Sequence, residues 1–183
     1  ASWTNVLGPV VSMPTLELLA GEKEFLSAIG HRLIVTPHLA EFSRLSGFSL
    51  DEIKDDLIGR AGPWPPTGTV NLVLKGAPTL IVSAKTGNVY VNPTGNAGMA
   101  CGGMGDILTG MIAAMTAISM SDLCSAACAG VYLHGAAGDA CRKDRGPMDF
   151  TPMETADAVP SVLADLEKNL ALPILQQPLI GGK

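Results

Sequence analysis

The run Gly102-Gly103-Met104-Gly105-Asp106 combines residues that can hold an anion with one that can accept a proton. Glycine allows positive φ angles and leaves consecutive backbone N–H groups uncovered. Residues 107–118, which follow at once, are apolar enough to predict a buried helix, and the positive end of its dipole faces the same place. The sequence therefore predicts an anion hole with the carboxylate of Asp106 at its mouth.

Spacing alone leaves two interpretations of this glycine-rich turn (residues 102–106) open. In the first, Asp106 takes the proton of a hydroxyl that attacks a terminal phosphoryl group, while the amides stabilise the developing charge. In the second, the glycines form a tight turn and Asp106 merely favours the start of a helix. The residues that flank the turn are needed to distinguish a catalytic role from a structural one.

The elements around the turn alternate between strands and helices, which indicates one α/β domain over residues 1–183. Hydrophobic patterns predict strands at residues 6–11, 32–36, 70–75, 79–83 and 88–91, the last two joined as a hairpin. Helices are predicted at residues 14–29, 39–46, 50–58, 107–118, 122–142 and 151–170.

Local capping signals support several of these helix starts. Ser49 and Glu52 have the spacing of a capping box. The run Thr151-Pro152-Met153-Glu154 predicts a second box, with proline at the first helical position. Ser121 is expected to cap the next-to-last helix.

Two segments are expected to lie outside regular elements. Residues 61–68 hold three prolines around Trp64 and cannot continue a helix, so they predict a loop. In it, Trp64 either stacks on a nucleobase or anchors the loop. The tail at residues 173–183 is expected to be peripheral.

Composition narrows the class of partner. Apolar residues make up 47% of the chain and charged ones 16%, which suits a buried sheet and argues against disorder. A net charge of −5, with 12 Lys and Arg and no basic run, predicts no nucleic-acid partner. Small anions stay possible, because a helix N-terminus binds them through backbone amides.

The cysteines and the hydropathy of the chain give expectations about metal binding, membrane association and cellular location. The four cysteines form no CxxC pair, and Cys124 and Cys128, one helical turn apart, lack further ligands for zinc and are expected to pack in the core. The apolar runs are too short for a membrane span, and residues 1–9 do not resemble a signal peptide. We therefore expect no membrane partner and, by default, a cytoplasmic protein.

Five ordered blocks resemble those of NAD(P)H-hydrate dehydratases, members of the ribokinase-like superfamily. The stretch 92–110, which contains the glycine-rich turn, is similar to the family's signature. Upstream, residues 36–47 resemble its TPHxxEFxxLxG block and residues 74–79 its LKGxxT block. Downstream, YLHG at 132–135 and AGD at 137–139 match as well. Several blocks in order are far more specific than one glycine motif.

The resemblance implies a fold and a reaction. The fold is ribokinase-like, a mainly parallel sheet flanked by helices, with an antiparallel hairpin. In the reaction, ADP or ATP phosphorylates the ring hydroxyl of hydrated NADH or NADPH (NADHX, NADPHX), and loss of phosphate restores the dinucleotide. Mg²⁺ is expected to bridge the phosphates, because their charge must be offset, and no protein metal ligand is expected.

The resemblance also implies roles for individual residues. Asp106 is the implied base and, with His38, contacts the hydrated dinucleotide. Nucleotide and phosphate contacts are implied for Lys75, Gly76, Ala77, Pro78, Thr79, Asn96, Gly102, Gly103, Met104 and Gly105.

Plainer roles stay open for several of these side chains. His38 follows a proline and could simply cap the next helix, and Lys75 could be a solvated charge at a strand end. Glu41 is expected to be structural rather than catalytic. His134, among small residues of a long helix, is expected to be a packed core histidine.

The chain departs from the family pattern near its start. The family's VVDADxLNLL block aligns with residues 10–19, where both aspartates are missing, and its GPGLG turn has no safe match. We therefore expect a shortened N-terminal part, with either a sheet cut at one side or another chain covering the exposed edge, and we expect a homo-oligomer. Two other functions remain open: a sugar or pyrimidine kinase of the same superfamily, and a relic that binds nucleotide without turnover.

Overall fold

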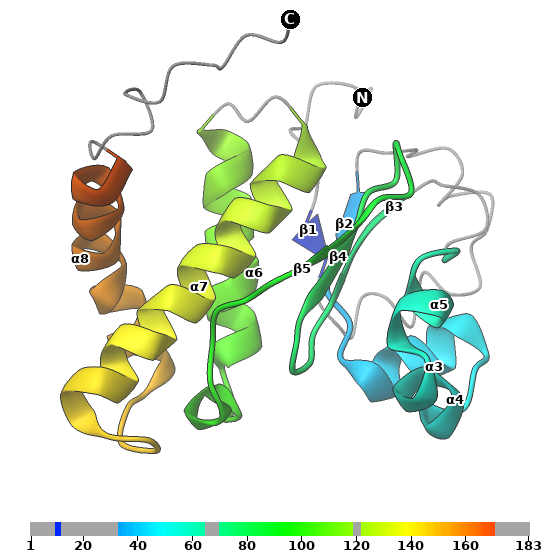
Figure 1. Ribbon diagram of the computed structural model, residues 1–183, viewed down its shortest axis with the longest axis horizontal. Coiled ribbons are helices and arrows are strands. Elements are labelled where there is room, and N and C mark those ends of the chain that lie inside the picture. Colours follow the sequence, from blue (N-terminus) through cyan, green and yellow to red (C-terminus); the bar gives the residue numbers. More distant parts are fainter. Residues whose placement is uncertain (1–9, 12–32, 65–69, 119–121, 171–183) are drawn as a thin grey trace, which may run out of the picture.

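The computed structural model describes residues 10–11, 33–64, 70–118 and 122–170. Within them, one sheet runs in the order β1-β2-β3-β4-β5 (Figure 1). β1, β2 and β3 are parallel, whereas β4 is antiparallel to both of its neighbours. The strands are β1 (Val10–Val11), β2 (Leu33–Val35), β3 (Val70–Leu74), β4 (Leu80–Val82) and β5 (Val89–Val91). The predicted α/β class is confirmed, and the antiparallel part includes the β3–β4 pair besides the predicted hairpin.

Helices cover both faces of the sheet. Figure 1 shows α3, α4 and α5 on one side, α6 and α7 on the other, and α8 outside α7. The helices are α3 (Leu39–Ser46), α4 (Leu50–Asp55), α5 (Leu57–Ala61), α6 (Met104–Ala117), α7 (Leu123–Arg145) and α8 (Pro152–Leu170), with a 3₁₀ turn, η3 (Ala97–Met99).

The period of two in the strands divides the core into two layers. Alternate strand residues pack with Phe42 and Ile53 of α3 and α4, namely Leu33, Val35, Val70, Leu72, Leu74, Leu80 and Val82. The residues between them pack with α6 and α7, namely Ile34, Val73 and Ile81. Because β2, β3 and β4 are buried on both faces, they read as nearly continuous apolar runs in the sequence.

The start of α6 differs from the prediction. The helix begins at Met104, one turn before the predicted Ile107. Gly103 is its N-cap with φ of 91°, and the Gly103 carbonyl accepts from the amides of Asp106 (3.1 Å) and Ile107 (3.2 Å). Asp106 therefore lies inside the first turn of the helix rather than before it.

Two other helices also differ from their predicted bounds. The predicted helix at residues 50–58 is divided at Asp56, whose side chain accepts from the Gly59 amide (2.9 Å) and so starts a new helix. The N-cap of α7 is Asp122, and the helix continues past its predicted end to Arg145. The two predicted capping boxes, at the starts of α4 and α8, are confirmed.

Trp64 turns toward the core rather than toward a ligand. It packs edge-on against Phe42, with ring centroids 5.4 Å apart, at the border of the layer under α3 and α4. Of its two predicted roles, the structure supports the loop anchor.

Several predictions lie outside the described residues: the helix at residues 14–29, the cap at Ser121 and the tail at 173–183. In the part of the chain that is described, no helix is long and apolar enough to cross a membrane.

Candidate active site

The carboxyl ends of β2 and β3 bring His38 and Lys75 together. The parallel pairing of these strands continues beyond their last residues, because the Lys75 amide donates to the Pro37 carbonyl at 2.8 Å. His38 and Lys75 form the next bridge of the ladder. Ligands bind at this end of the strands in open α/β sheets.

A buried carboxylate, Glu41, links these two side chains. Glu41 Oε2 accepts from the His38 amide (2.6 Å), and His38 Nδ1 accepts from the Glu41 amide (3.2 Å), so His38 caps α3. Glu41 Oε1 lies 3.0 Å from His38 Nε2, and its Oε2 lies 3.8 Å from Lys75 Nζ. Because Nδ1 accepts a hydrogen bond from the Glu41 amide, a neutral ring carries its proton on Nε2, directed at Glu41.

The glycine-rich turn lies against Lys75. A Cβ added to Gly105 would be 3.4 Å from Lys75 Nζ. Gly103 has the left-handed φ of 91°, which favours glycine. Asp106 is exposed in the first turn of α6, at the positive end of the helix dipole. Lys75 thus lies at the N-terminus of α6, next to the residue that precedes Asp106.

The loop before the turn is tied to α7. The carboxylate of Asp139 accepts from the Gly95 amide (2.8 Å) and from Asn96 Nδ2 (2.9 Å). Asn96 Oδ1 accepts from the Gly98 amide (3.0 Å) and so caps η3. Both ends of the Asn96 side chain are therefore used within the loop and its contact with α7.

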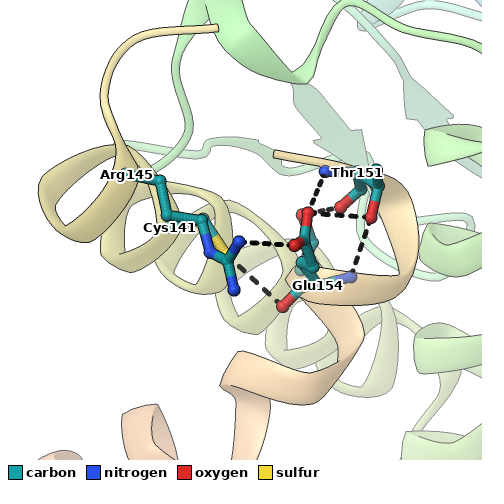
Figure 2. Close-up of polar contacts among 5 residues, drawn as sticks. Cys141, Arg145, Thr151 and Glu154 are labelled. Carbon is teal, nitrogen blue, oxygen red and sulfur yellow. Dashed lines mark hydrogen bonds and ion pairs between the residues drawn. The ribbon is translucent and has the colours of Figure 1, made fainter. Parts of the chain in front are cut away.

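The first turn of α8 lies on the other side of the glycine-rich turn. A Cβ on Gly103 would be 3.2 Å from Pro152 Cγ. Figure 2 shows how this end of α8 is fixed: Glu154 bonds Thr151 in the capping box and pairs with Arg145 of α7 at 2.6 Å. The hydrogen bonds from Thr151 lower the pKa of Glu154. A charged contact between α7 and α8 thus supports the turn.

The remaining predicted ligand residues are placed around these contacts. Residues 76–79 connect β3 to β4 next to Lys75, and Thr79 Oγ1 donates to the Gly76 carbonyl (3.1 Å). Met104 is buried with Cys141 and Phe150, so only its backbone can face a ligand. Gly102 is exposed.

Two carboxylates have contacts that the sequence did not indicate. Glu41, expected to be structural, forms the capping box of α3 with His38 and also lies 3.8 Å from Lys75 Nζ. Asp139 was noted only as part of the matching AGD block, and its contact with the loop was not foreseen. The block itself was the available signal, because a charged residue on an otherwise small-residue helix face needs a partner.

Two side-chain groups outside the site follow their predictions. Cys124 and Cys128 pack in the layer between the sheet and α7. His134 is buried on α7, and burial lowers its pKa to about 4, so it is neutral at neutral pH. Its ring hydrogen-bonds the backbone of Met104, at the start of α6.

Comparisons with solved structures identify the class of fold. The chain is similar to a ribokinase-like superfamily protein of Enterococcus faecalis, with 26% identity, a TM-score of 0.72, and coverage of 85% of this chain and 52% of that one. It is also similar to the ADP/ATP-dependent NAD(P)H-hydrate dehydratase of Bacillus subtilis crystallised with ATP and Mg²⁺ (34% identity, TM-score 0.68, 73% and 48% coverage). The protein is thus of the ribokinase-like class.

The family follows from sequence. The profile of the NAD(P)H-hydrate dehydratase family matches residues 3–161, and the chain belongs to that family. A bifunctional NAD(P)H-hydrate repair enzyme of Moorella thermoacetica is 38% identical over 161 residues, which cover 88% of this chain and 30% of that protein. The ADP-dependent (S)-NAD(P)H-hydrate dehydratase of Neisseria meningitidis is 40% identical over 114 residues, 62% of this chain and 38% of that protein. The matched region is about a third of these curated relatives.

Proposed function

We propose that the chain dehydrates hydrated NADH or NADPH at the expense of a nucleotide. ADP or ATP phosphorylates the ring hydroxyl of the hydrate, and the phosphate then leaves as the ring double bond re-forms. With ATP, the products are NADH or NADPH, ADP, inorganic phosphate and a proton. The names of the relatives support this reaction, which is a repair of damaged dinucleotide.

The observation that carries the proposal is the approach of Lys75 to Gly105 at the N-terminus of α6, directly before Asp106. Asp106 is exposed and so is accessible as a base for the attacking hydroxyl. The amides of the turn and the Lys75 ammonium beside Gly105 would stabilise negative charge on the phosphoryl group. His38, half exposed and held by Glu41, would face the hydrated dinucleotide.

The residues also fit a nucleotide with Mg²⁺. Lys75 and residues 76–79 would contact the nucleotide, and the turn at 102–105 would hold its phosphates. No protein cage of three ligands exists among the described residues, so the ion would be held chiefly by phosphate oxygens and water. When bound, Mg²⁺ neutralises charge on the transferred group.

The test is the return of NADH absorbance when purified chain is incubated with hydrated NADH, Mg²⁺ and either ADP or ATP. We expect turnover with at least one nucleotide. Asp106→Asn should lower kcat about a hundredfold or more, the share of a general base. The exposed Asp157→Asn on α8 is the matched control and should leave kcat unchanged.

Other outcomes would replace the proposal. Phosphorylation of a sugar or pyrimidine alcohol without restoration of NADH would favour the kinase. Nucleotide binding without phosphate release, unaffected by Asp106→Asn, would favour the relic.

A further inference from the structure

One carboxylate on α7 holds the loop that leads to the glycine-rich turn. The two oxygens of Asp139 serve different donors: Oδ2 accepts from the Gly95 amide (2.8 Å) and Oδ1 from Asn96 Nδ2 (2.9 Å). Thr94 Oγ1 adds a bond to the Tyr132 carbonyl (3.0 Å) on the same helix. Backbone and side chain of the loop are thus fixed together.

The helix backbone comes close enough because the residues facing the loop are glycines. A Cβ on Gly135 would collide with Thr94, and one on Gly138 would collide with Met99. Asp139 follows directly and reaches the loop with a short side chain. The close packing and the carboxylate bonds therefore act on the same segment.

This segment sets where the glycine-rich turn begins. Asn96, once bonded to Asp139, caps η3, and Met99 at the end of η3 lies against Gly138. Three residues later the chain enters the glycine-rich turn, which places Gly105 beside Lys75. A shift of the loop would move the turn relative to the carboxyl ends of β2 and β3.

We propose that Asp139 is a positioning residue for phosphoryl transfer: it fixes residues 95–99 and thereby the distance between the glycine-rich turn and Lys75. The inference rests on the proposed function. Asp139 touches neither reacting group in this arrangement and acts through Gly95 and Asn96. Its effect should be large, because a misplacement of about 1 Å can cost roughly a hundredfold in rate.

The experiment compares Asp139→Ala, Asp139→Asn, Asn96→Ala and the Asp139→Ala/Asn96→Ala double variant in the NADH-restoration assay. Asp139→Ala should lower kcat about tenfold to a hundredfold, with a smaller change in the KM for nucleotide. Asp139→Asn keeps one acceptor oxygen and should lie between. The double variant should lose less than the product of the two single losses, because both remove one contact.

Controls separate positioning from simple loss of stability. Asp144→Asn, an exposed carboxylate on the same helix, should match the unmodified chain. Thermal unfolding shows which variants fold, and if Asp139→Ala does not, Asp139→Asn and Asn96→Ala carry the test. Folded variants with unchanged kcat, or losses that multiply independently, overturn the inference.

A second readout does not depend on turnover. Hydrogen exchange of residues 92–100 should be faster in Asp139→Asn than in the unmodified chain, whereas α8 should be unaffected. Unchanged exchange in the loop overturns the inference. An unmodified chain that binds nucleotide without turnover, yet shows this faster exchange in the variant, contradicts the proposed function and leaves Asp139 as the anchor of the loop.

Discussion

At the scale of single residues, the site depends on polar groups whose surroundings fix their state. Glu41 is almost fully covered, yet each of its oxygens has a partner in His38 or Lys75, which offsets the cost of burying a carboxylate. His134, by contrast, is buried without a partner for one of its ring nitrogens, Nε2, among the described residues. The ring is kept neutral by burial.

The state of His134 gives a pH-dependent stability. Burial lowers its pKa from 6.5 to about 4 in the folded protein, despite the opposing bond to Met104. The unfolded chain therefore binds a proton between these two values that the folded chain does not, and stability falls as pH falls from 6.5 toward 4. The loss from this group is on the order of 3 kcal/mol.

The measurement is the free energy of unfolding by urea at several pH values across that window. In His134→Gln, this part of the acid destabilisation should disappear, although the variant starts less stable because it alters a packed position. Parallel pH profiles for the two proteins would show that His134 does not titrate in this way.

At the scale of elements, the glycine-rich turn needs one glycine far more than its neighbour. Gly103 combines a φ of 91° with a Cβ direction only 3.2 Å from Pro152 Cγ. Gly103→Ala should therefore destabilise the fold by about 1–2 kcal/mol and loosen the start of α6. Gly102, with no atom within 4 Å of its Cβ direction, is the matched control.

Thermal unfolding of the two variants tests this difference. We expect a clearly lower Tm for Gly103→Ala and a Tm near that of the unmodified chain for Gly102→Ala. Equal changes in both would mean that the left-handed conformation of Gly103 does not constrain the turn.

These elements also show which helix boundaries can be predicted from the local sequence. Ser49 and Thr151 were predictable as caps because a capping box is complete within four residues. The start of α6 was not, since glycines read as a turn whether or not the helix has already begun. Asp56, which divides the predicted helix at 50–58, competes with the helix by a bond that the pattern of apolar residues does not register.

Contacts between distant segments were the least predictable part of the site. The strand ends bring His38 to Lys75 through parallel pairing, which the order of strands and helices favoured. The bonds from Asp139 to Gly95 and Asn96 join segments whose pairing no local pattern specifies. Only the ordered family blocks indicated that both segments serve one function.

At the scale of the whole molecule, the candidate site lies at the carboxyl ends of the parallel strands, between the helices of the two faces of the sheet. His38 caps α3, and α6 begins within the glycine-rich turn. Helices from opposite faces of the sheet therefore point their N-termini toward the carboxyl ends of β2 and β3. α7 and α8 support that arrangement from behind. The anionic substrates that we propose would thus meet two helix dipoles in a protein of net charge −5.

The exposed edge strand β5 supports the prediction that the protein is a homo-oligomer. β5 is the outermost described strand on its side, and Tyr90 and Val91 on it are 44% and 51% exposed. An uncovered edge with apolar side chains favours pairing with another chain. Light scattering should therefore give a multiple of the 18.9 kDa chain mass, and Val91→Lys should lower it if β5 forms the contact. A monomer at all concentrations would contradict the prediction, whereas an oligomer unaffected by Val91→Lys would place the contact away from β5.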